Sequence, residues 1–587
     1  MEKWFVAAKR ADFDKWAEDF NISPVLARIL RNRELTDETQ IERFLHGTID
    51  ELYSPWLLKD MDRAADIILS ALSAKKKLRV IGDYDADGIC SSYILTEGLK
   101  ILGADVDTAI PHRIYDGYGL NDQLIEEAAR DGVELIITCD NGIAAARQIG
   151  LASDKGIAVI VTDHHEVPFE EENGVRRELL PPAEAVVDPK QEGCTYPFDG
   201  ICGAVVAYKL MSALAERTGS GALERAMDEF LQFAAIATVC DVMELKDENR
   251  IIVKEGIKRI QNTQNEGMKA LIAVTDTDVS KLSAYHLGFV LGPCLNATGR
   301  LDSASLALEL FQSRTRAEAC LAAGELKRLN DTRKGLTAKG VEEAEKYITE
   351  HHMEKYPVML IYLPEVHESI AGIIAGRIRE KYNHPVFVLT KGENGVKGSG
   401  RSIEGYNMFE HMTRQKHYFT KFGGHKLAAG LSMREEDIEA LQKALNNDCN
   451  LKEEDFIPRV HIDIAMPLYY ADERLASELS LLEPYGVGNP RPLFAQKNLR
   501  LIRGMRMGAN KNYARFMVLT PEGYEVQLVF FGDLDAFEEF LDNRYGNSAS
   551  ERLYNEKCSY EISVVYQLGL NTYRGKTEVQ YIMRHYC

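Results

Sequence analysis

Three carboxylates at alternate positions, Asp83, Asp85 and Asp87, follow the apolar residues 78–81 and precede Gly88. An apolar run that ends in turn residues indicates a strand whose carboxyl end carries a ligand-binding loop. Carboxylates this close repel one another, so a cation is expected among them, and oxygen ligands suit Mg²⁺ or Mn²⁺ better than zinc. Taken alone, the motif is equally compatible with a solvated acidic turn.

Acidic residues end two further apolar runs and interrupt a third. They are Asp140, Asp163 with the adjacent His164 and His165, and Asp241. Because parallel strands place their carboxyl ends on one edge of a sheet, side chains far apart in the sequence can converge there. An aspartate in an apolar context is costly unless it is paired or binds a metal. The four motifs together predict a dinuclear metal site.

Length and composition indicate a multidomain protein. At 587 residues the chain exceeds one core, and roughly 100 to 200 residues per domain predicts three to five units. Its ten cysteines show no C-x-x-C spacing, so buried free thiols are expected. The net charge of −20 argues weakly against nonspecific binding to a polyanion but allows a local basic groove.

The sequence shows neither a membrane segment nor a leader peptide. No apolar run approaches the roughly 20 residues that cross a bilayer. Residues 1–5 lack the basic and then apolar layout of a signal peptide. We therefore expect a cytoplasmic protein that does not enter the membrane, and since nothing demands a dimer, we expect a monomer.

Patterns along the chain divide it into five regions. Residues 1–75 have helical periodicity and are predicted to form a leader packed on the next domain. In residues 76–245, short β-rich runs alternate with helical stretches, which is typical of a parallel sheet with crossover helices. Residues 246–345 are predicted to form a helical connector and residues 346–452 a second α/β domain. Residues 453–587 contain short strands that suggest a small barrel or sandwich.

The motif from Gly82 to Gly88, together with Asp163-His164-His165, resembles the DHH phosphoesterase superfamily. Within it, the chain is similar to the RecJ family of exonucleases. Residues 423–430 resemble the glycine-rich signature of the DHHA1 domain, and residues 482–490 resemble the entry to the RecJ oligonucleotide-binding barrel. The resemblance spans nearly the whole chain. It implies a parallel-sheet DHH domain, a DHHA1 domain and a C-terminal OB-fold barrel.

The resemblance also implies a set of metal ligands. It assigns two Mn²⁺ or Mg²⁺ ions to Asp85, Asp87, Asp140, His164 and Asp241, with Asp140 as the bridge. Many DHH enzymes have a histidine where this chain has Ile81, so Asp83 or water is expected to replace that ligand. Two such ions could activate water for attack on a phosphodiester.

Three further side chains are candidates for catalytic roles. Asp163 is expected to orient its neighbours, and His165 to contact the scissile phosphate or to transfer a proton. His425, in the glycine-rich turn, is a third candidate, with a purely structural tight turn as the alternative.

A second set of residues is expected to bind the nucleic acid. The resemblance assigns the 5′-terminal phosphate to Ser399 and Arg401. It implies further contacts with the strand from Arg113, Asn296, Arg300 and Asn330. The nearby Tyr118 could stack on a base, and Gly424 belongs to the turn with His425, which could approach the metal site or the DNA. For each arginine alone, a surface or helix-capping role is the alternative. In the C-terminal region, cations alternate with aromatic residues, which suits tracking of a single strand.

The resulting hypothesis is a metal-dependent exonuclease that degrades single-stranded DNA from 5′ to 3′ to mononucleotides in DNA repair and recombination. A helicase and a single-strand-binding protein are the expected partners. Two alternatives stay open at this point. One is a phosphodiesterase for short oligonucleotides or cyclic dinucleotides, and the other is a catalytically idle scaffold that binds single strands.

Overall fold

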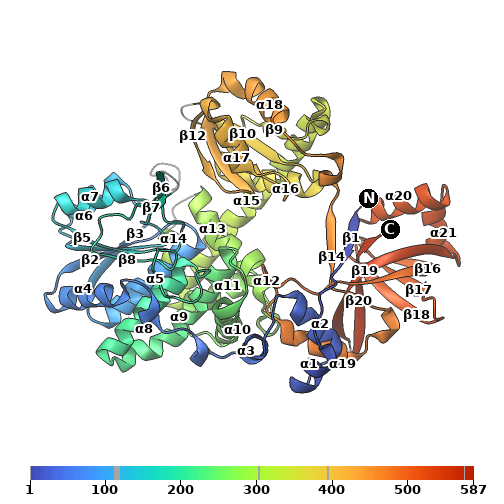
Figure 1. Ribbon diagram of the computed structural model, residues 1–587, viewed down its shortest axis with the longest axis horizontal. Helices are drawn as coiled ribbons and strands as arrows, with labels where there is room; N and C mark the ends of the chain where they lie inside the picture. Colours follow the sequence, from blue (N-terminus) through green and yellow to red (C-terminus); the bar gives the residue numbers. More distant parts are fainter. Residues whose placement is uncertain (1, 112–118, 173–174, 302–304, 393–394, 574) are drawn as a thin grey trace. The chain divides into compact units, whose positions relative to one another are not determined.

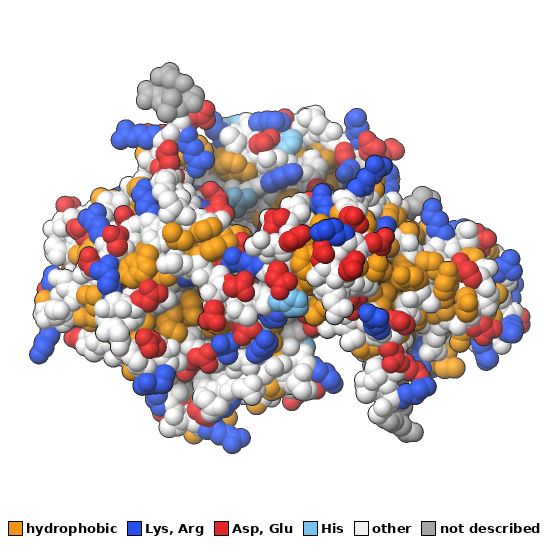
Figure 2. Space-filling view, turned by 60° about the horizontal axis from the view of Figure 1, so that its bottom comes forward, with side chains coloured by type: hydrophobic (Ala, Val, Ile, Leu, Met, Phe, Trp, Pro, Cys, Tyr) orange, Lys and Arg blue, Asp and Glu red, His pale blue; other side chains and the backbone are white. Residues whose placement is uncertain are grey.

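The computed structural model describes residues 2–111, 119–172, 175–301, 305–392, 395–573 and 575–587. Contacts divide the chain into two units, Met1–Gly47 with Pro458–Cys587, and Thr48–Ile457. Among the described residues, no helix is both long and apolar enough to cross a bilayer. Figure 2 shows acidic and basic side chains interspersed over the face in view.

A five-stranded parallel sheet forms the centre of the first part of the larger unit (Figure 1). In spatial order its strands are β3 (Asp105–Ala109), β2 (Lys77–Ile81), β4 (Leu135–Cys139), β5 (Ala158–Thr162) and β8 (Ala185–Val187). The β-rich runs of the sequence at residues 78–81, 135–139, 158–162 and 185–187 predict four of these strands. The fifth, β3, is an edge strand in which Val106 is the one buried residue, so it gives little hydrophobic signal.

Helices cover both faces of this sheet (Figure 1). One face packs against α4 (Met61–Ser73), α5 (Ala86–Ile101) and α8 (Gly203–Thr218), and the other against α6 (Asp122–Arg130) and α7 (Ala146–Asp154). Helix α9 (Gly221–Cys240) packs on α5 and α8. Adjacent strand residues point to opposite faces. Val80 and Ile137 accordingly join the core of the first face, and Ile81 and Ile136 that of the second. Burial on both faces explains why these strands are continuous apolar runs.

The predicted helical connector follows this sheet. It consists of α10 (Asp247–Gln261), α11 (Glu266–Val274), α12 (Ala284–His286), the π-helical turn η4 (Leu287–Leu291), α13 (Gly292–Leu301), α14 (Ser305–Gln312) and α15 (Arg316–Glu350). Helix α15 starts with a capping box in which Thr315 and Glu318 bind each other's backbone N–H groups. This long helix leads into the second α/β domain.

That second domain has a mixed five-stranded sheet. Its order is β12 (Phe419–Gly424), β13 (Ala428–Met433), β11 (Gly395–Arg401), β10 (Val386–Gly392) and β9 (Met359–Tyr362), with only β9 and β10 parallel. Helix α16 (Ala371–Tyr382) connects β9 to β10 and packs across β11. The packing brings the start of α16 beside the side chains of β11.

The smaller unit contains a closed β-barrel. Its strands are β16 (Phe494–Met507), β17 (Tyr513–Leu519), β18 (Glu525–Phe530), β20 (Lys576–Tyr586) and β19 (Tyr560–Tyr573), and β19 pairs back with β16. Closure removes the free edges of the sheet. The barrel interpretation of this region is therefore confirmed over the sandwich.

The expected packing of the leader on the following domain is wrong for residues 1–47. Strand β1 (Lys3–Val6) pairs in parallel with β14 (Arg459–Ile462), and α2 (Pro24–Asn32) packs its apolar side into the barrel core. The Arg33 guanidinium also forms a 3.0 Å ion pair with the Asp463 carboxylate. Helical periodicity identifies the apolar face of α2 but does not show which partner covers it.

Candidate metal centre

The loop after β2 folds back onto the start of α5. Asp85 caps that helix, because its Oδ1 accepts hydrogen bonds from the backbone N–H groups of Asp87 (2.9 Å) and Gly88 (3.1 Å). A Cβ atom at Gly88 would lie 2.4 Å from the carbonyl oxygen of Asp83, so only glycine fits this position. The loop thus turns Asp83, Asp85 and Asp87 toward the carboxyl edge of the sheet.

Two neighbouring strand ends supply the next side chains. Asp140 follows β4 in a left-handed conformation with φ 59°, and His164 follows β5. The His164 Nε2 atom lies 3.1 Å from Asp140 Oδ1 and 3.5 Å from Asp87 Oδ2. Asn141 binds the carbonyl oxygen of Ile81 at 3.1 Å and so joins the ends of β2 and β4.

Asp241 completes the cluster from a different kind of element. It caps the C-terminus of α9, and its Oδ2 lies 3.7 Å from His164 Nε2. Candidate ligand atoms lie within 4.8 Å of one another in three groups. These are Asp83, Asp85 and Asp140; Asp140, His164 and His165; and Asp87, His164 and Asp241. All six predicted ligands therefore converge, including Asp83.

The N-terminus of α8 holds Asp87 in place, a contact that the sequence did not predict. The backbone N–H groups of Gly203 and Ala204 donate hydrogen bonds of 2.7 Å to the two carboxylate oxygens of Asp87. The helix dipole also favours an anion there. A Cβ atom at Gly203 would lie 2.7 Å from the Asp140 Cβ, so this position needs glycine.

The electrostatics of the cluster call for a cation. Burial and the nearby charges of Asp87, Asp85, Asp83 and Asp241 raise the pKa of Asp140 well above its usual range. Burial followed by the same kind of repulsion raises the pKa of Asp241 to about 8 and also raises the pKa of Asp85. Divalent cations would relieve this repulsion.

His164 and His165 have side-chain pKa values that are shifted in opposite directions. Burial lowers the pKa of His164, which favours the neutral imidazole that can bind a metal. His165 is 44% exposed, and its Nδ1 lies 2.8 Å from Asp163 Oδ1. Partial burial acts to lower the pKa of His165, but the bond to Asp163 outweighs it and raises that pKa to about 9. This raised pKa favours the imidazolium form of His165 in the metal-free protein at neutral pH.

Asp163 organises this edge from behind the cluster. Its Oδ1 accepts hydrogen bonds from the backbone N–H groups of His164 (2.7 Å) and His165 (3.2 Å), and its Oδ2 accepts one from that of Ile143 (2.9 Å). Burial alone would raise the pKa of Asp163, but the bonds from His165 and Ile143 lower it. Asp163 thus stays ionised and orients both histidines.

The donor set fits hard divalent cations. Carboxylate oxygens dominate, and one neutral imidazole adds a ligand without adding negative charge, a combination suited to Mg²⁺ or Mn²⁺. Asp140 belongs both to the group with Asp83 and Asp85 and to the group with the histidines. Asp140 would therefore be the carboxylate that could serve both ions, which is the role that the family resemblance implies for it.

Divalent cations are expected to stabilise the protein against unfolding. Because the folded cluster binds them and the unfolded chain does not, ligand at a hundred times the dissociation constant adds about 2.7 kcal/mol. The unfolding temperature of the chelator-treated protein should rise on titration with Mn²⁺ or Mg²⁺. Sodium chloride at matched ionic strength is the control, and an equal rise with it would indicate screening rather than binding.

The predicted strand contacts of the connector have different surroundings. The Oδ1 of Asn296 on α13 accepts a 2.8 Å hydrogen bond from the backbone N–H of Ala86. Asn296 therefore contacts the loop of residues 82–88, which carries Asp83, Asp85 and Asp87 and is called the metal loop below. Asn330 on α15 is 1% exposed, and its amide binds Cys294 Sγ at 3.3 Å. Its Oδ1 also accepts a 2.9 Å bond from Arg333 Nη2. Asn330 therefore positions Arg333 and is itself shielded from a strand.

Ser399 and Arg401 lie together on β11, facing the first turn of α16. A Cβ atom at Gly372 would lie 3.1 Å from Arg401 Nη2 and 3.5 Å from Ser399 Oγ. The absence of a side chain at Gly372 leaves space beside the guanidinium and the hydroxyl, at a helix N-terminus that favours anions. Within the described part of the chain, no carboxylate lies within ion-pair distance of Arg401.

Other predicted residues are placed elsewhere or lie outside the described residues. Gly424 is the last residue of β12 and pairs with Ala429, and His425 begins the exposed turn to β13. None of the three ligand groups contains His425. Gly424 has φ 147°, a value that favours glycine. Arg113 and Tyr118 fall outside the described residues, as does the side chain of Arg300.

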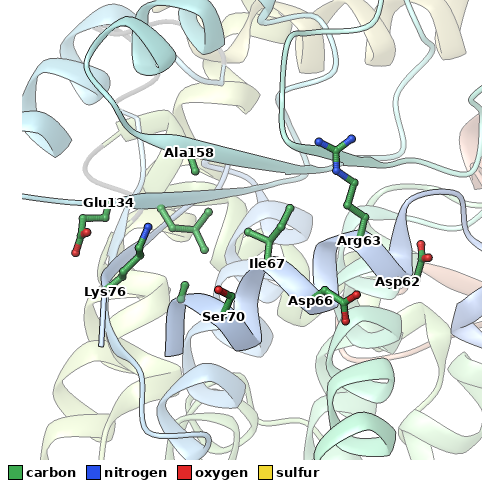
Figure 3. A pocket seen from close by; sticks show the side chains of 10 residues that line it. Asp62, Arg63, Asp66, Ile67, Ser70, Lys76, Glu134 and Ala158 are labelled. Carbon is green, nitrogen blue, oxygen red and sulfur yellow. The ribbon is translucent and has the colours of Figure 1, made fainter. Parts of the chain in front are cut away.

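A surface hollow of about 410 Å³ lies at the opposite, amino edge of the parallel sheet (Figure 3). Side chains of α4 line one side, and Lys76, Glu134 and Ala158 lie across from them. Sheets of this kind bind their ligands at the carboxyl edge. The hollow is therefore separate from the metal cluster.

Three family models match the chain. The DHH family N-terminal domain matches residues 77–238, the DHHA1 domain residues 355–450, and the RecJ OB domain residues 462–585. The first match contains all the clustered side chains except Asp241, which lies just beyond it.

Comparison with whole proteins points the same way. The chain is 34% identical to the single-stranded-DNA-specific exonuclease RecJ of Bacillus subtilis, covering 93% of this chain and 68% of the relative. It is 31% identical to that of Escherichia coli, covering 98% of both. The crystal structure of Thermus thermophilus RecJ in complex with Mn²⁺ covers the whole chain and is itself covered to 79%, with a TM-score of 0.81 and 27% identity. The chain therefore belongs to the RecJ family.

Proposed function

We propose that this protein is a metal-dependent exonuclease that degrades single-stranded DNA from the 5′ end to mononucleotides. The observation that carries the proposal is the cluster of carboxylates and His164 at one sheet edge. It lies in a chain that is similar along most of its length to single-stranded-DNA-specific exonucleases. Two Mn²⁺ or Mg²⁺ ions fit the ligand set, and a solved relative is a complex with Mn²⁺.

The residues of the cluster have distinct tasks in this reaction. Bound divalent cations would supply Lewis acidity and a nucleophile at neutral pH. Asp140 and Asp87 would hold these cations, while the amides of Gly203 and Ala204 fix Asp87. His165, kept as an imidazolium by Asp163, would donate a hydrogen bond to the scissile phosphate. A protonated His165 fits this role better than that of a general base.

The 5′ polarity rests on Ser399 and Arg401. A guanidinium, a hydroxyl and a helix N-terminus together suit a terminal phosphate, which carries more charge than a phosphodiester. Burial and the nearby Arg379 lower the pKa of the Arg401 guanidinium, and an anion would offset this repulsion. Following the family resemblance, we assign these groups to the 5′-phosphorylated end of a strand.

The barrel domain contains a stretch of sequence that is rich in cations. From Pro484 to Pro521 the sequence contains no acidic residue. The cations there are Arg491, Lys497, Arg500, Arg503, Arg506, Lys511 and Arg515. Among the described residues, Arg491 and Arg506 pair with carboxylates and the other five do not. A row of uncompensated cations on a protein of net charge −20 is a local attraction for a polyanion.

Digestion of end-labelled single strands beside the same sequence as a duplex tests the proposal. A 5′ label should be released at once as a mononucleotide, whereas a 3′-labelled strand should shorten progressively. Chelator should stop both, and the duplex should resist. Release of the 3′ label first would refute the polarity. Faster hydrolysis of dinucleotides than of long strands would favour the phosphodiesterase alternative, and binding without hydrolysis the idle scaffold.

Arg401→Ala is expected to slow degradation of 5′-phosphorylated strands by about 10- to 100-fold, since a hydrogen bond to a charged group contributes about 1.5 to 3 kcal/mol. Strands with a 5′ hydroxyl should be affected much less. The matched control is Arg434→Ala, because Arg434 is an exposed arginine that pairs with Glu436 and Asp437. Equal loss on both kinds of strand would contradict the assignment.

The cytoplasmic location, the role in repair and recombination, and the helicase and single-strand-binding partners remain predictions from the family resemblance. The same holds for the monomeric state.

A further inference from the structure

Two aromatic side chains are exposed at the π-helical turn of the connector. Tyr285 is 62% exposed and Phe289 is 70% exposed. Their rings stack on each other, with centroids 5.2 Å apart and planes inclined by 23°. π-helical turns occur frequently at functional sites. Two exposed aromatic rings side by side also indicate an interaction site more strongly than single, scattered apolar side chains do.

This turn is fixed against the helix that ends at the ligand Asp241. A Cβ atom at Gly288 would lie 3.1 Å from Val239 Cγ1, and one at Gly292 would lie 2.3 Å from Cys240 Sγ. The Cys240 thiol also contacts the carbonyl oxygen of Leu287 at 3.6 Å. These glycines allow η4 to pack tightly on the last residues of α9, so the aromatic pair has a fixed position relative to Asp241.

The same segment continues to the metal loop. Seven positions after Phe289, which is about two helical turns or roughly 10 Å of rise, Asn296 binds the backbone N–H of Ala86. Further along α13, a Cβ atom at Gly299 would lie 2.6 Å from the carbonyl oxygen of Tyr84. One continuous run of helix therefore connects the aromatic pair to the metal cluster.

The charge of this segment favours a polyanion. From Val279 to Leu301 the sequence contains neither Asp nor Glu, in a chain with 90 acidic residues. Lys281 and Arg300 are its cations, and Lys281 pairs at 3.2 Å with Asp278, which directly precedes the segment. A single strand approaching the aromatic pair would meet no carboxylate from this segment.

We propose that Tyr285 and Phe289 form a platform on which bases of the single strand stack beside the metal cluster, an inference that rests on the proposed function. Base stacking on aromatic rings tolerates any sequence, because every base has a π face. The platform would hold the strand in line with the cluster without selecting particular bases.

Steady-state kinetics on single-stranded DNA test this platform. Phe289→Ala and Tyr285→Ala should each raise KM by about 5- to 150-fold, the range for loss of one base-stacking contact, with a much smaller change in kcat. Phe289→Trp should restore KM, whereas Phe289→Leu, which keeps an apolar side chain without a π face, should not. The matched control is Tyr356→Ala, because Tyr356 is another exposed aromatic residue of the same unit, and its KM should stay at the wild-type value.

Strands with abasic positions separate stacking from other roles of these residues. Wild type and Phe289→Ala should have similar KM values on an abasic strand, because neither can stack on a missing base. A wild-type KM for both alanine variants, or a loss that persists on the abasic strand, would overturn the platform. If the wild type did not degrade single strands, the proposed function would fail. Fluorescence anisotropy of an intact strand in chelator would then decide the platform, and unchanged binding by Phe289→Ala would refute it.

Discussion

Asp140→Asn is expected to reduce hydrolysis of single-stranded DNA by about a thousandfold, which corresponds to about 4 kcal/mol of transition-state stabilisation. Asp140 is the carboxylate common to two of the three ligand groups. Its replacement by a neutral amide would weaken the hold on both cations. Initial rates in excess Mn²⁺ measure this effect. Retention of more than a tenth of the wild-type rate would contradict the bridging role.

Asparagine is the appropriate replacement because of the backbone at this position. Asp140 has φ 59°, a conformation that asparagine adopts readily and alanine does not. Asp60→Asn is the matched control, since Asp60 has φ 61° and its Oδ2 accepts a hydrogen bond from Val186 N–H outside the cluster. The control should keep wild-type activity. If Asp60→Asn were also inactive, the loss of activity in Asp140→Asn could not be attributed to the cluster.

Stability should change in opposite directions with and without metal. In the metal-free protein, burial and repulsion disfavour the ionised form of Asp140, and this costs stability at neutral pH. Asp140→Asn removes this carboxyl group, so the unfolding temperature should rise. With Mn²⁺ the wild type should be the more stable of the two, because its cluster binds the cations more tightly. The same order in both conditions would argue against a metal site at Asp140.

The sequence was most informative where one physical rule governed the outcome. Strands β2, β4 and β5 are buried on both faces, so each appears as an apolar run, and the residues after them must share one edge of the sheet. Topology alone therefore predicts that Asp85, Asp140 and His164 converge. Asp241 was found by its apolar context, although it ends a helix rather than a strand.

Contacts that depend on tertiary packing could not be predicted in this way. The amides of Gly203 and Ala204 bind Asp87 from more than a hundred residues away, and backbone groups leave no mark in side-chain patterns. The shielding of Asn330 behind Cys294 depends on how α13 and α15 pack. The partner of the N-terminal helices was likewise undetermined, since amphipathicity indicates a buried face and not what covers it.

The structure shows how Asp83 lies relative to Asp85 and Asp87, the other two carboxylates of the first motif. Asp83 is buried, and its carboxylate lies within 4.8 Å of ligand atoms of Asp85 and Asp140. It thus belongs to the same cluster as Asp85 and Asp87. Its carboxylate could supply the ligand that the apolar side chain of Ile81 cannot. Whether Asp83 binds metal directly remains a proposal. Metal titration of Asp83→Asn beside Asp140→Asn would address it.

Glu248→Ala is expected to destabilise the fold by about 3 to 5 kcal/mol, the usual cost of leaving a buried charge without its partner. Lys209 Nζ lies 2.7 Å from Glu248 Oε1, and the two side chains are 2% and 0% exposed. Glu248 also accepts hydrogen bonds from the backbone N–H of Tyr53, at 2.6 Å, and from the hydroxyl of Tyr196. Denaturant unfolding of the chelator-treated protein measures the change.

The double variant Lys209→Met/Glu248→Leu should recover most of that loss, because apolar side chains of similar size often replace a buried ion pair at little cost. A double-mutant cycle of the two single variants and the double variant measures the coupling between the two charges. If the losses in unfolding free energy were strictly additive, the two residues would not act as a unit. Lys209 lies on α8, the helix whose first amides hold Asp87. If the buried pair fixes that helix, Glu248→Ala should also weaken Mn²⁺ binding, and the double variant should restore it. If the double variant recovers stability but not metal affinity, the buried ion pair affects the metal centre in a way that does not depend on the stability of the fold.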